Sequence, residues 1–235
     1  MKKGEAKRFG LIGLCAVFAL LFAGLGIWQL QRLQWKLGLI AKVEQRIHAP
    51  AVPVPNSRSW KDLEPDSIEY RRVYAVGTFI HEKEALVDAL TERGPGYWVL
   101  TPLQTADGNI IVNRGFVPQD RATPNARPEG HQARIQKVEG LLRITEPHGR
   151  YLRPNRPNED KWYSRDIAAI AKARTIAVAP FFIDADAKPN PGGYPVGGMT
   201  VVRFRNTHLI YAVTWFGLAA LAVVGLWLLR KPSRR

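Results

Sequence analysis

The chain has 235 residues and a formal net charge of +14, with 34 Lys and Arg residues, of which eight stand in the first eight and the last six positions. The remaining basic residues are scattered among prolines and acidic residues, which argues against a nucleic-acid-binding protein. The single cysteine, Cys15, excludes an intrachain disulfide framework and any two-thiolate metal or haem-attachment motif.

Two uncharged apolar runs, 9–30 and 208–229, are each long enough to cross the ~30 Å hydrocarbon core of a membrane. The first run is too long for a cleaved signal sequence and continues into a helical pattern, so it predicts an uncleaved anchor. Short basic termini predict that both ends are cytoplasmic. The predicted order is a cytoplasmic N-terminus (1–8), a transmembrane helix (9–30), an extracytoplasmic domain (31–207), a second transmembrane helix (208–229) and a cytoplasmic tail (230–235).

Beyond residue 30 the helical pattern continues, with Leu33, Leu37 and Ile40 at spacings of three and four. This stripe could lie on the membrane surface or dock on the central domain. Prolines at 50, 53 and 55 end the helix, because proline cannot continue it. The domain between the spans is periplasmic in a bacterium and faces the intermembrane space in a mitochondrion.

The central domain contains short β-rich runs separated by turn residues. The Asp107-Gly108 pair predicts a hairpin, and Gly94-Pro95-Gly96 predicts a turn. One helix is predicted over 164–173, with Ser164 as its N-cap. The predicted fold is an α+β membrane protein, in which two transmembrane helices flank a mainly antiparallel, open barrel-like β domain with short helices. The predicted strands are 72–80, 84–90, 97–103, 109–117, 135–144, 180–185 and 199–204.

The common catalytic motifs, such as a nucleophile elbow, a zinc-protease helix or a phosphate-binding loop, do not occur in the sequence. Asp184 and Asp186 leave a paired-carboxylate site open, although such a pair near a turn is usually structural. Arg114, in Asn113-Arg114-Gly115, could bind an anionic group or form part of a strand-end bulge. The histidines outside the spans lack metal-ligand spacing and are interpreted as solvated surface residues; they are His48, His81, His131 and His148.

The most distinctive cluster lies where the spans meet the outer membrane face. His208, Tyr211 and Trp215 are spaced to share one face of the second helix. The other members of the cluster are Trp28 and Gln29 on the first span, with Arg32, Arg203 and Arg205 just outside the spans. One interpretation is an aromatic belt with snorkelling arginines. The other is a haem site, with His208 as the iron ligand, aromatic rings against the porphyrin and arginines for its propionates.

Four motifs, in order along nearly the whole chain, resemble the Surfeit locus protein 1 family, the cytochrome c oxidase assembly factors. They are GIWQLQRLQWK, then GYWVLTPL with GNIIVNRGFVP, then PNRPNEDKWYSRD, and finally RNTHLIYAVTWFGLA. The resemblance implies a two-pass protein of the bacterial inner membrane, not an enzyme, that acts in respiratory chain biogenesis. It implies transient binding of haem a by His208, which matches the family's ligand position, although Thr207 stands where an acidic residue is expected.

The resemblance also implies partners, namely the oxidase catalytic subunit and haem a synthase, besides membrane lipid. Two alternatives remain open at the sequence level. The chain could be a scaffold that holds the oxidase subunit without binding haem, or a membrane-tethered enzyme. Close packing of the spans is predicted through small residues, Ala19 and Ala23 on one helix and Gly217 and Ala220 on the other.

Overall fold

A computed structural model of the chain describes residues 3–150, 152–202 and 204–230. The chain divides into two compact units. One unit combines residues 1–42 with 202–235, and the other comprises residues 43–201. The first holds the helix pair and the second holds a β-barrel domain.

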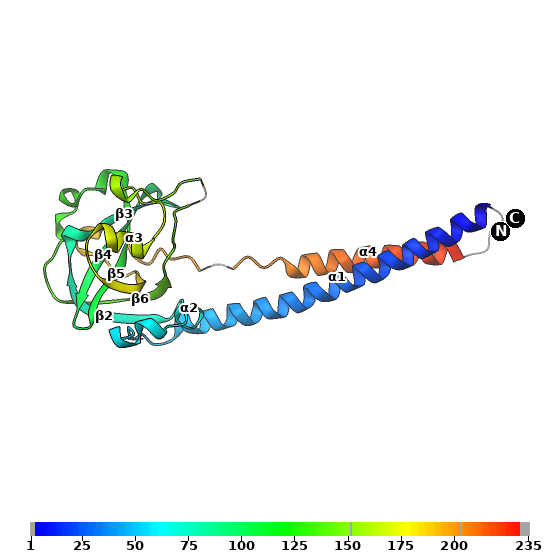
Figure 1. Cartoon of the computed structure of the whole chain (residues 1–235), viewed down its shortest axis with the longest axis horizontal. Helices are drawn as coiled ribbons and strands as arrows, with labels where there is room; N and C mark the ends of the chain where they lie inside the picture. Colours follow the sequence, from blue (N-terminus) through cyan, green and yellow to red (C-terminus); the bar gives the residue numbers. More distant parts are fainter. Residues whose placement is uncertain (1–2, 151, 203, 231–235) are drawn as a thin grey trace. The chain divides into compact units, whose positions relative to one another are not determined.

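The helical unit consists of α1 (Lys3–His48), up to residue 42, and α4 (His208–Arg230), which lie side by side and antiparallel (Figure 1). Both helices are long and apolar enough to cross a membrane. Each has a stripe of buried and half-buried residues that repeats every seven residues, the spacing of a left-handed coiled coil. The stripe is Cys15, Ala19, Phe22, Gly26, Gln29, Leu33 and Lys36 on α1, and His208, Ala212, Trp215, Ala219, Ala222, Leu226 and Leu229 on α4.

Within the described residues, the second unit is built on a seven-stranded sheet in the order β1-β2-β6-β7-β5-β4-β3. An additional pairing of β2 with β4 closes five of these strands into a barrel, while β1 and β3 extend it. Only the β1–β2 and β5–β7 pairs are parallel among these strands. The bounds are β1 Val52–Pro53, β2 Arg72–Phe79, β3 Ala85–Thr91, β4 Gly94–Thr105, β5 Gly108–Pro118, β6 Gln136–Ile144 and β7 Val178–Ala185.

Short helices connect the strands. The α-helices are α2 (Pro65–Ile68) and α3 (Ile167–Ala173). The 3₁₀ turns are Ser57–Asp62, His81–Lys83, Gln119–Arg121, Pro124–Ala126, Pro128–Gly130, Pro157–Glu159 and Pro191–Gly193. The predicted fold class, a mainly antiparallel barrel-like domain flanked by two long apolar helices, is therefore confirmed.

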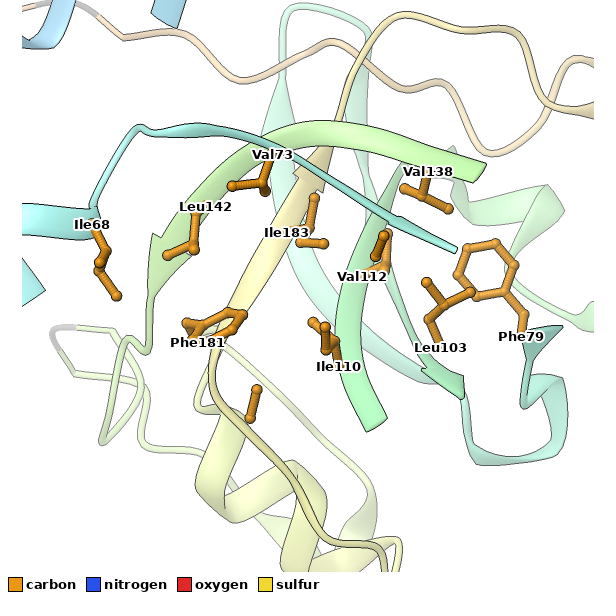
Figure 2. Close-up of a cluster of buried hydrophobic side chains, with 12 residues drawn as sticks. Ile68, Val73, Phe79, Leu103, Ile110, Val112, Val138, Leu142, Phe181 and Ile183 are labelled. Atoms are coloured by element: carbon orange, nitrogen blue, oxygen red, sulfur yellow. The ribbon is translucent and has the colours of Figure 1, made fainter. Parts of the chain in front are cut away.

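The β domain has two apolar cores, one on each side of the sheet. The first is formed by alternating inward residues, such as Val73, Ala75 and Phe79 of β2, and includes Phe181 and Ile183 of β7 (Figure 2). The second lies beneath α3 and the long loop before it, where Trp162 is only 2% exposed. The sheet is thus covered on both sides around β5 and β7. As a result, the polar residues of those strands, Asn113, Arg114 and Asp184, are buried.

Three local expectations are corrected by the structure. Gly94-Pro95-Gly96 lies within β4 and pairs with β3, because the turn of that hairpin falls at residues 92–93. The helix α3 begins later than predicted and its N-cap is Asp166, whose side chain accepts a hydrogen bond from the Ala169 amide. The described residues of 199–204 form no strand. The hairpin at Asp107-Gly108 is confirmed, with Ala106 and Asp107 as its two loop residues.

Candidate functional site

A hydrogen bond between the two long helices joins two of the residues predicted from the sequence. His208 Nδ1 lies 2.8 Å from Gln29 Oε1, and the Gln29 side chain is nearly buried. His208 begins α4, where its backbone amide donates to Asn206 Oδ1. A ring N–H that donates to an amide oxygen fixes the tautomer of the imidazole and directs the other nitrogen, Nε2, away from the bond.

The packing next to this pair involves residues that the sequence reasoning missed. The ring of Trp215 stacks against Phe22, with 5.6 Å between centroids. A Cβ added at Gly26 would lie 2.7 Å from the ring of Phe216, so the glycine gives that ring its space. The sequence carries no clear signal for Phe22 and Gly26, because both spans are apolar on all sides and the seven-residue repeat is visible only in the burial of their residues.

Trp28 and Tyr211 are both 53% exposed and do not belong to the buried stripes. Each residue advances a helix by about 100°, and the two helices are antiparallel. Trp28, just before Gln29, and Tyr211, about one turn after His208, therefore lie on the same flank of the helix pair. The structure therefore places Trp28 and Tyr211 on one flank of the Gln29–His208 bond, and separates Tyr211 from the packed face that Trp215 shares with His208.

The predicted arginines differ in their surroundings. The Arg32 guanidinium stacks over the Trp35 ring, 4.1 Å from its centroid, on the same flank as Trp28. Arg205 is exposed. Arg203 lies outside the described residues.

The small residues predicted to bring the spans together are only partly in the contact. Ala19 and Ala23 on α1 are half-buried. On α4, nothing lies within 4 Å of a Cβ at Gly217, and Ala220 is exposed. The buried alanines of α4 are instead Ala212 and Ala219.

In the β domain, Asp184 forms the centre of a buried polar cluster. It is 2% exposed and accepts hydrogen bonds from Asn113 Nδ2 at 2.8 Å, Arg165 Nη1 at 3.1 Å and Arg143 Nη1 at 3.1 Å. Glu146 pairs with Arg165 on the outer side. Burial raises the pKa of Glu146, but the hydrogen bond and charge of Arg165 outweigh it and leave that pKa below its ordinary value. Because both oxygens of Asp184 are engaged by cations or amides, this cluster is better suited to holding β5, β6 and β7 together than to acid–base chemistry.

The Asn113-Arg114-Gly115 segment is a β-bulge, as the structural alternative predicted, but it lies inside β5 and not at the end of a strand. Trp98 pairs with Phe116 and Leu100 with Asn113, so Arg114 and Gly115 both lie opposite Val99. Gly115 has φ of +126°, and a Cβ added there would lie 2.1 Å from the Val196 carbonyl oxygen. Arg114 is 2% exposed and donates to the Gly130 carbonyl oxygen at 2.7 Å, and burial lowers its pKa to about 10.

Two of the histidines interpreted as solvated surface residues are in fact partly buried against each other. The rings of His81 and His131 meet edge to face, with 4.7 Å between centroids. Burial, together with the nearby charges of Arg114 and His131, lowers the pKa of His81 to about 4. Burial likewise lowers the pKa of His131. The surface interpretation failed because residues 50 positions apart are brought together by the 3₁₀ turns at 81–83 and 128–130.

Comparison with known proteins gives a consistent result. The profile of the SURF1 family matches residues 16–220. Surfeit locus protein 1 of Rattus norvegicus is 39% identical over 229 residues, which cover 90% of this chain and 72% of that protein. Surfeit locus protein 1 of Homo sapiens is 38% identical, over 87% of this chain and 72% of that protein. A SURF1-like protein of Caenorhabditis elegans is 30% identical, over 87% of this chain and 68% of that protein.

Proposed function

Because the chain belongs to the SURF1 family, we propose that it is an assembly factor for cytochrome c oxidase that binds haem a transiently and aids its insertion into the catalytic subunit of the oxidase. The proposed location is a bacterial inner membrane, with both termini cytoplasmic and the barrel domain periplasmic. The two apolar helices support membrane attachment, and the basic residues at both ends support the orientation.

The observation that carries the haem proposal is the 2.8 Å contact between His208 Nδ1 and Gln29 Oε1. Histidines that ligate metals almost always donate their other ring N–H to a fixed acceptor, which orients the ring and raises the basicity of the ligating nitrogen. Gln29 supplies such an acceptor here. It leaves His208 Nε2 as the nitrogen that would ligate iron, and Gln29 as the residue that positions it.

The residues around the pair suit a flat, largely apolar ring system with acidic substituents. Haem a would supply the iron that takes an axial imidazole ligand. Trp28 and Tyr211 provide exposed aromatic surface on one flank of the hydrogen bond. Arg32, on the same flank, provides a guanidinium for a carboxylate, with Arg205 as a second candidate just before the second span. Trp215 and Phe22, whose rings stack, hold the two helices together next to the hydrogen-bonded pair.

The test compares three variants purified in detergent from a host that makes haem a. We expect His208→Ala to lose most of the co-purifying haem a. Gln29→Leu should retain His208 but reduce haem content about tenfold, because the imidazole is no longer oriented. His48→Ala, at an exposed position of α1, is the matched control and should bind as the wild type does.

Visible absorption spectra and haem extraction would measure the pigment, and thermal unfolding would confirm that each variant is folded. Equal haem content in wild type and His208→Ala would contradict the ligand assignment. If the wild-type protein from this host carried no haem, and the His208→Ala protein still captured the oxidase subunit, the scaffold alternative would hold instead.

A further inference from the structure

The barrel domain contains a group of three potential metal ligands that is separate from the helix pair. His81, Glu84 and His131 each offer one ligand atom, and these atoms lie within 4.8 Å of one another. His131 Nε2 is 3.9 Å from Glu84 Oε2. Two histidines and one glutamate form a donor set that Zn²⁺ and similar dications favour.

The two imidazoles have unused ligating capacity. Within the described part of the chain, Nε2 of His81 and Nε2 of His131 are buried and make no hydrogen bond. A buried polar atom without a partner costs free energy and calls for an explanation, such as an ion bound to it. Ligand atoms around a tetrahedral zinc lie ~3.3–3.5 Å apart, as expected from metal–ligand distances of ~2.0–2.2 Å, so small side-chain movements would close the group.

Glu84 is held firmly in place by neighbouring residues. Its carboxylate forms a bidentate ion pair with Arg127, whose side chain is 2% exposed, and accepts a hydrogen bond from Thr101 Oγ1 at 3.3 Å. A carboxylate has about four acceptor positions, so it can keep Arg127 and still ligate an ion. Such a partner orients the ligand in the way that outer residues do in known metal sites.

The charged side chains around the three ligand residues affect how tightly a dication could bind. Glu84 offsets Arg127, but the guanidinium of Arg114 lies 3.5 Å from His81 Nδ1 and opposes a dication. His81 and Glu84, but not His131, line a cleft with a volume of about 530 Å³, so two of the three ligand residues border it. Four carboxylates and one lysine line that cleft; they are Glu82, Glu84, Asp88, Asp160 and Lys161. Three of the carboxylates are paired, Glu84 with Arg127, Asp88 with Arg150 and Asp160 with Arg174.

We propose that His81, Glu84 and His131 bind a divalent first-row transition-metal ion, such as Zn²⁺, at the wall of this cleft. The fourth ligand position would be open to water or to a group presented by a partner, as in three-ligand zinc sites. The site is independent of the haem proposal, because its residues all lie in the barrel domain and His208 and Gln29 lie in the helical unit.

The experiment uses the full chain, purified in detergent without a histidine tag and stripped with a chelator. Equilibrium dialysis against Zn²⁺, followed by elemental analysis, should give one ion per chain. Co²⁺ in place of Zn²⁺ should give visible absorption bands typical of nitrogen and oxygen ligands. His131→Ala should weaken Zn²⁺ binding at least about tenfold.

Two controls separate this site from other histidines. His48→Ala and His208→Ala should both bind Zn²⁺ as the wild type does, so that failure of the haem proposal leaves this test intact. His81→Gln provides a second variant if His131→Ala does not fold, as judged by metal-free thermal unfolding. Sub-stoichiometric Zn²⁺ in the wild type, or equal binding by a folded His131→Ala or His81→Gln protein, would overturn the proposal.

Discussion

At the scale of single residues, the buried carboxylate of Asp184 is expected to stabilise the barrel domain. We expect Asp184→Asn to lower the free energy of unfolding by about 3–5 kcal/mol, because Arg143 and Arg165 then share a partly buried site with one carboxylate fewer. Thermal unfolding of the full chain in detergent, followed by circular dichroism in the β-sheet region, would measure the change.

Asp186, two residues further along, provides the matched control. Its side chain accepts a hydrogen bond from the Lys188 amide at an exposed position, so Asp186→Asn should change stability by well under 1 kcal/mol. Equal melting temperatures for the Asp184→Asn protein and the wild type would show that the cluster does not stabilise the barrel.

The residues that the sequence located and those that it missed differ for a physical reason. His208 and Gln29 stand at the outer ends of two spans, so membrane depth alone placed them at one level. Asp184, Arg143 and Arg165 come together only through the strand order β6-β7-β5 and the loop before α3. Residue spacing carries no information on such a pairing, and the same holds for His81 and His131.

At the scale of elements, the helix pair makes a testable contact through the chain's own cysteine. A Cβ at Gly225 would lie 3.5 Å from Cys15 Sγ. We expect Gly225→Cys to form an intrachain disulfide with Cys15 under a membrane-permeant oxidant. Faster migration on a non-reducing gel, reversed by a reductant, would report it.

Gly217→Cys is the control for this crosslink, because nothing lies within 4 Å of a Cβ at that glycine. It should remain reduced under the same conditions. Crosslinking of Gly217→Cys to a similar extent, or its absence in the Gly225→Cys protein, would contradict the antiparallel register described here.

The elements themselves were largely predictable, because alternation and turn residues mark β2, β5 and the hairpin at Asp107 clearly. The exceptions have local causes. Ser164 looked like an N-cap, but its hydroxyl donates to the Glu146 carbonyl and accepts from Asn155 and the Gly149 amide, so it ties two loops together. The parallel β5–β7 pair could not be foreseen, since 59 residues lie between the end of β5 and the start of β7.

At the scale of the whole molecule, the proposed orientation can be tested with single cysteines in a Cys15→Ala background. Glu92→Cys, at the exposed turn between β3 and β4, should react with a membrane-impermeant maleimide in intact bacterial spheroplasts. Lys7→Cys, near the start of α1, should react only after the membrane is permeabilised. Labelling of Lys7→Cys in intact spheroplasts would place the N-terminus on the opposite side.

The hydrogen bond between Gln29 and His208 also bears on how the two helices find their alignment. An apolar seam with a seven-residue repeat can slide by one helical turn at little cost, whereas a single polar pair within it specifies one alignment. Sliding α4 by a turn would set His208 against Leu25 or Leu33 and leave Gln29 unpaired, which is costly in lipid. The proposed haem ligand would thus also determine the register of its own helix pair. The same histidine would then serve both haem binding and the correct assembly of α1 with α4.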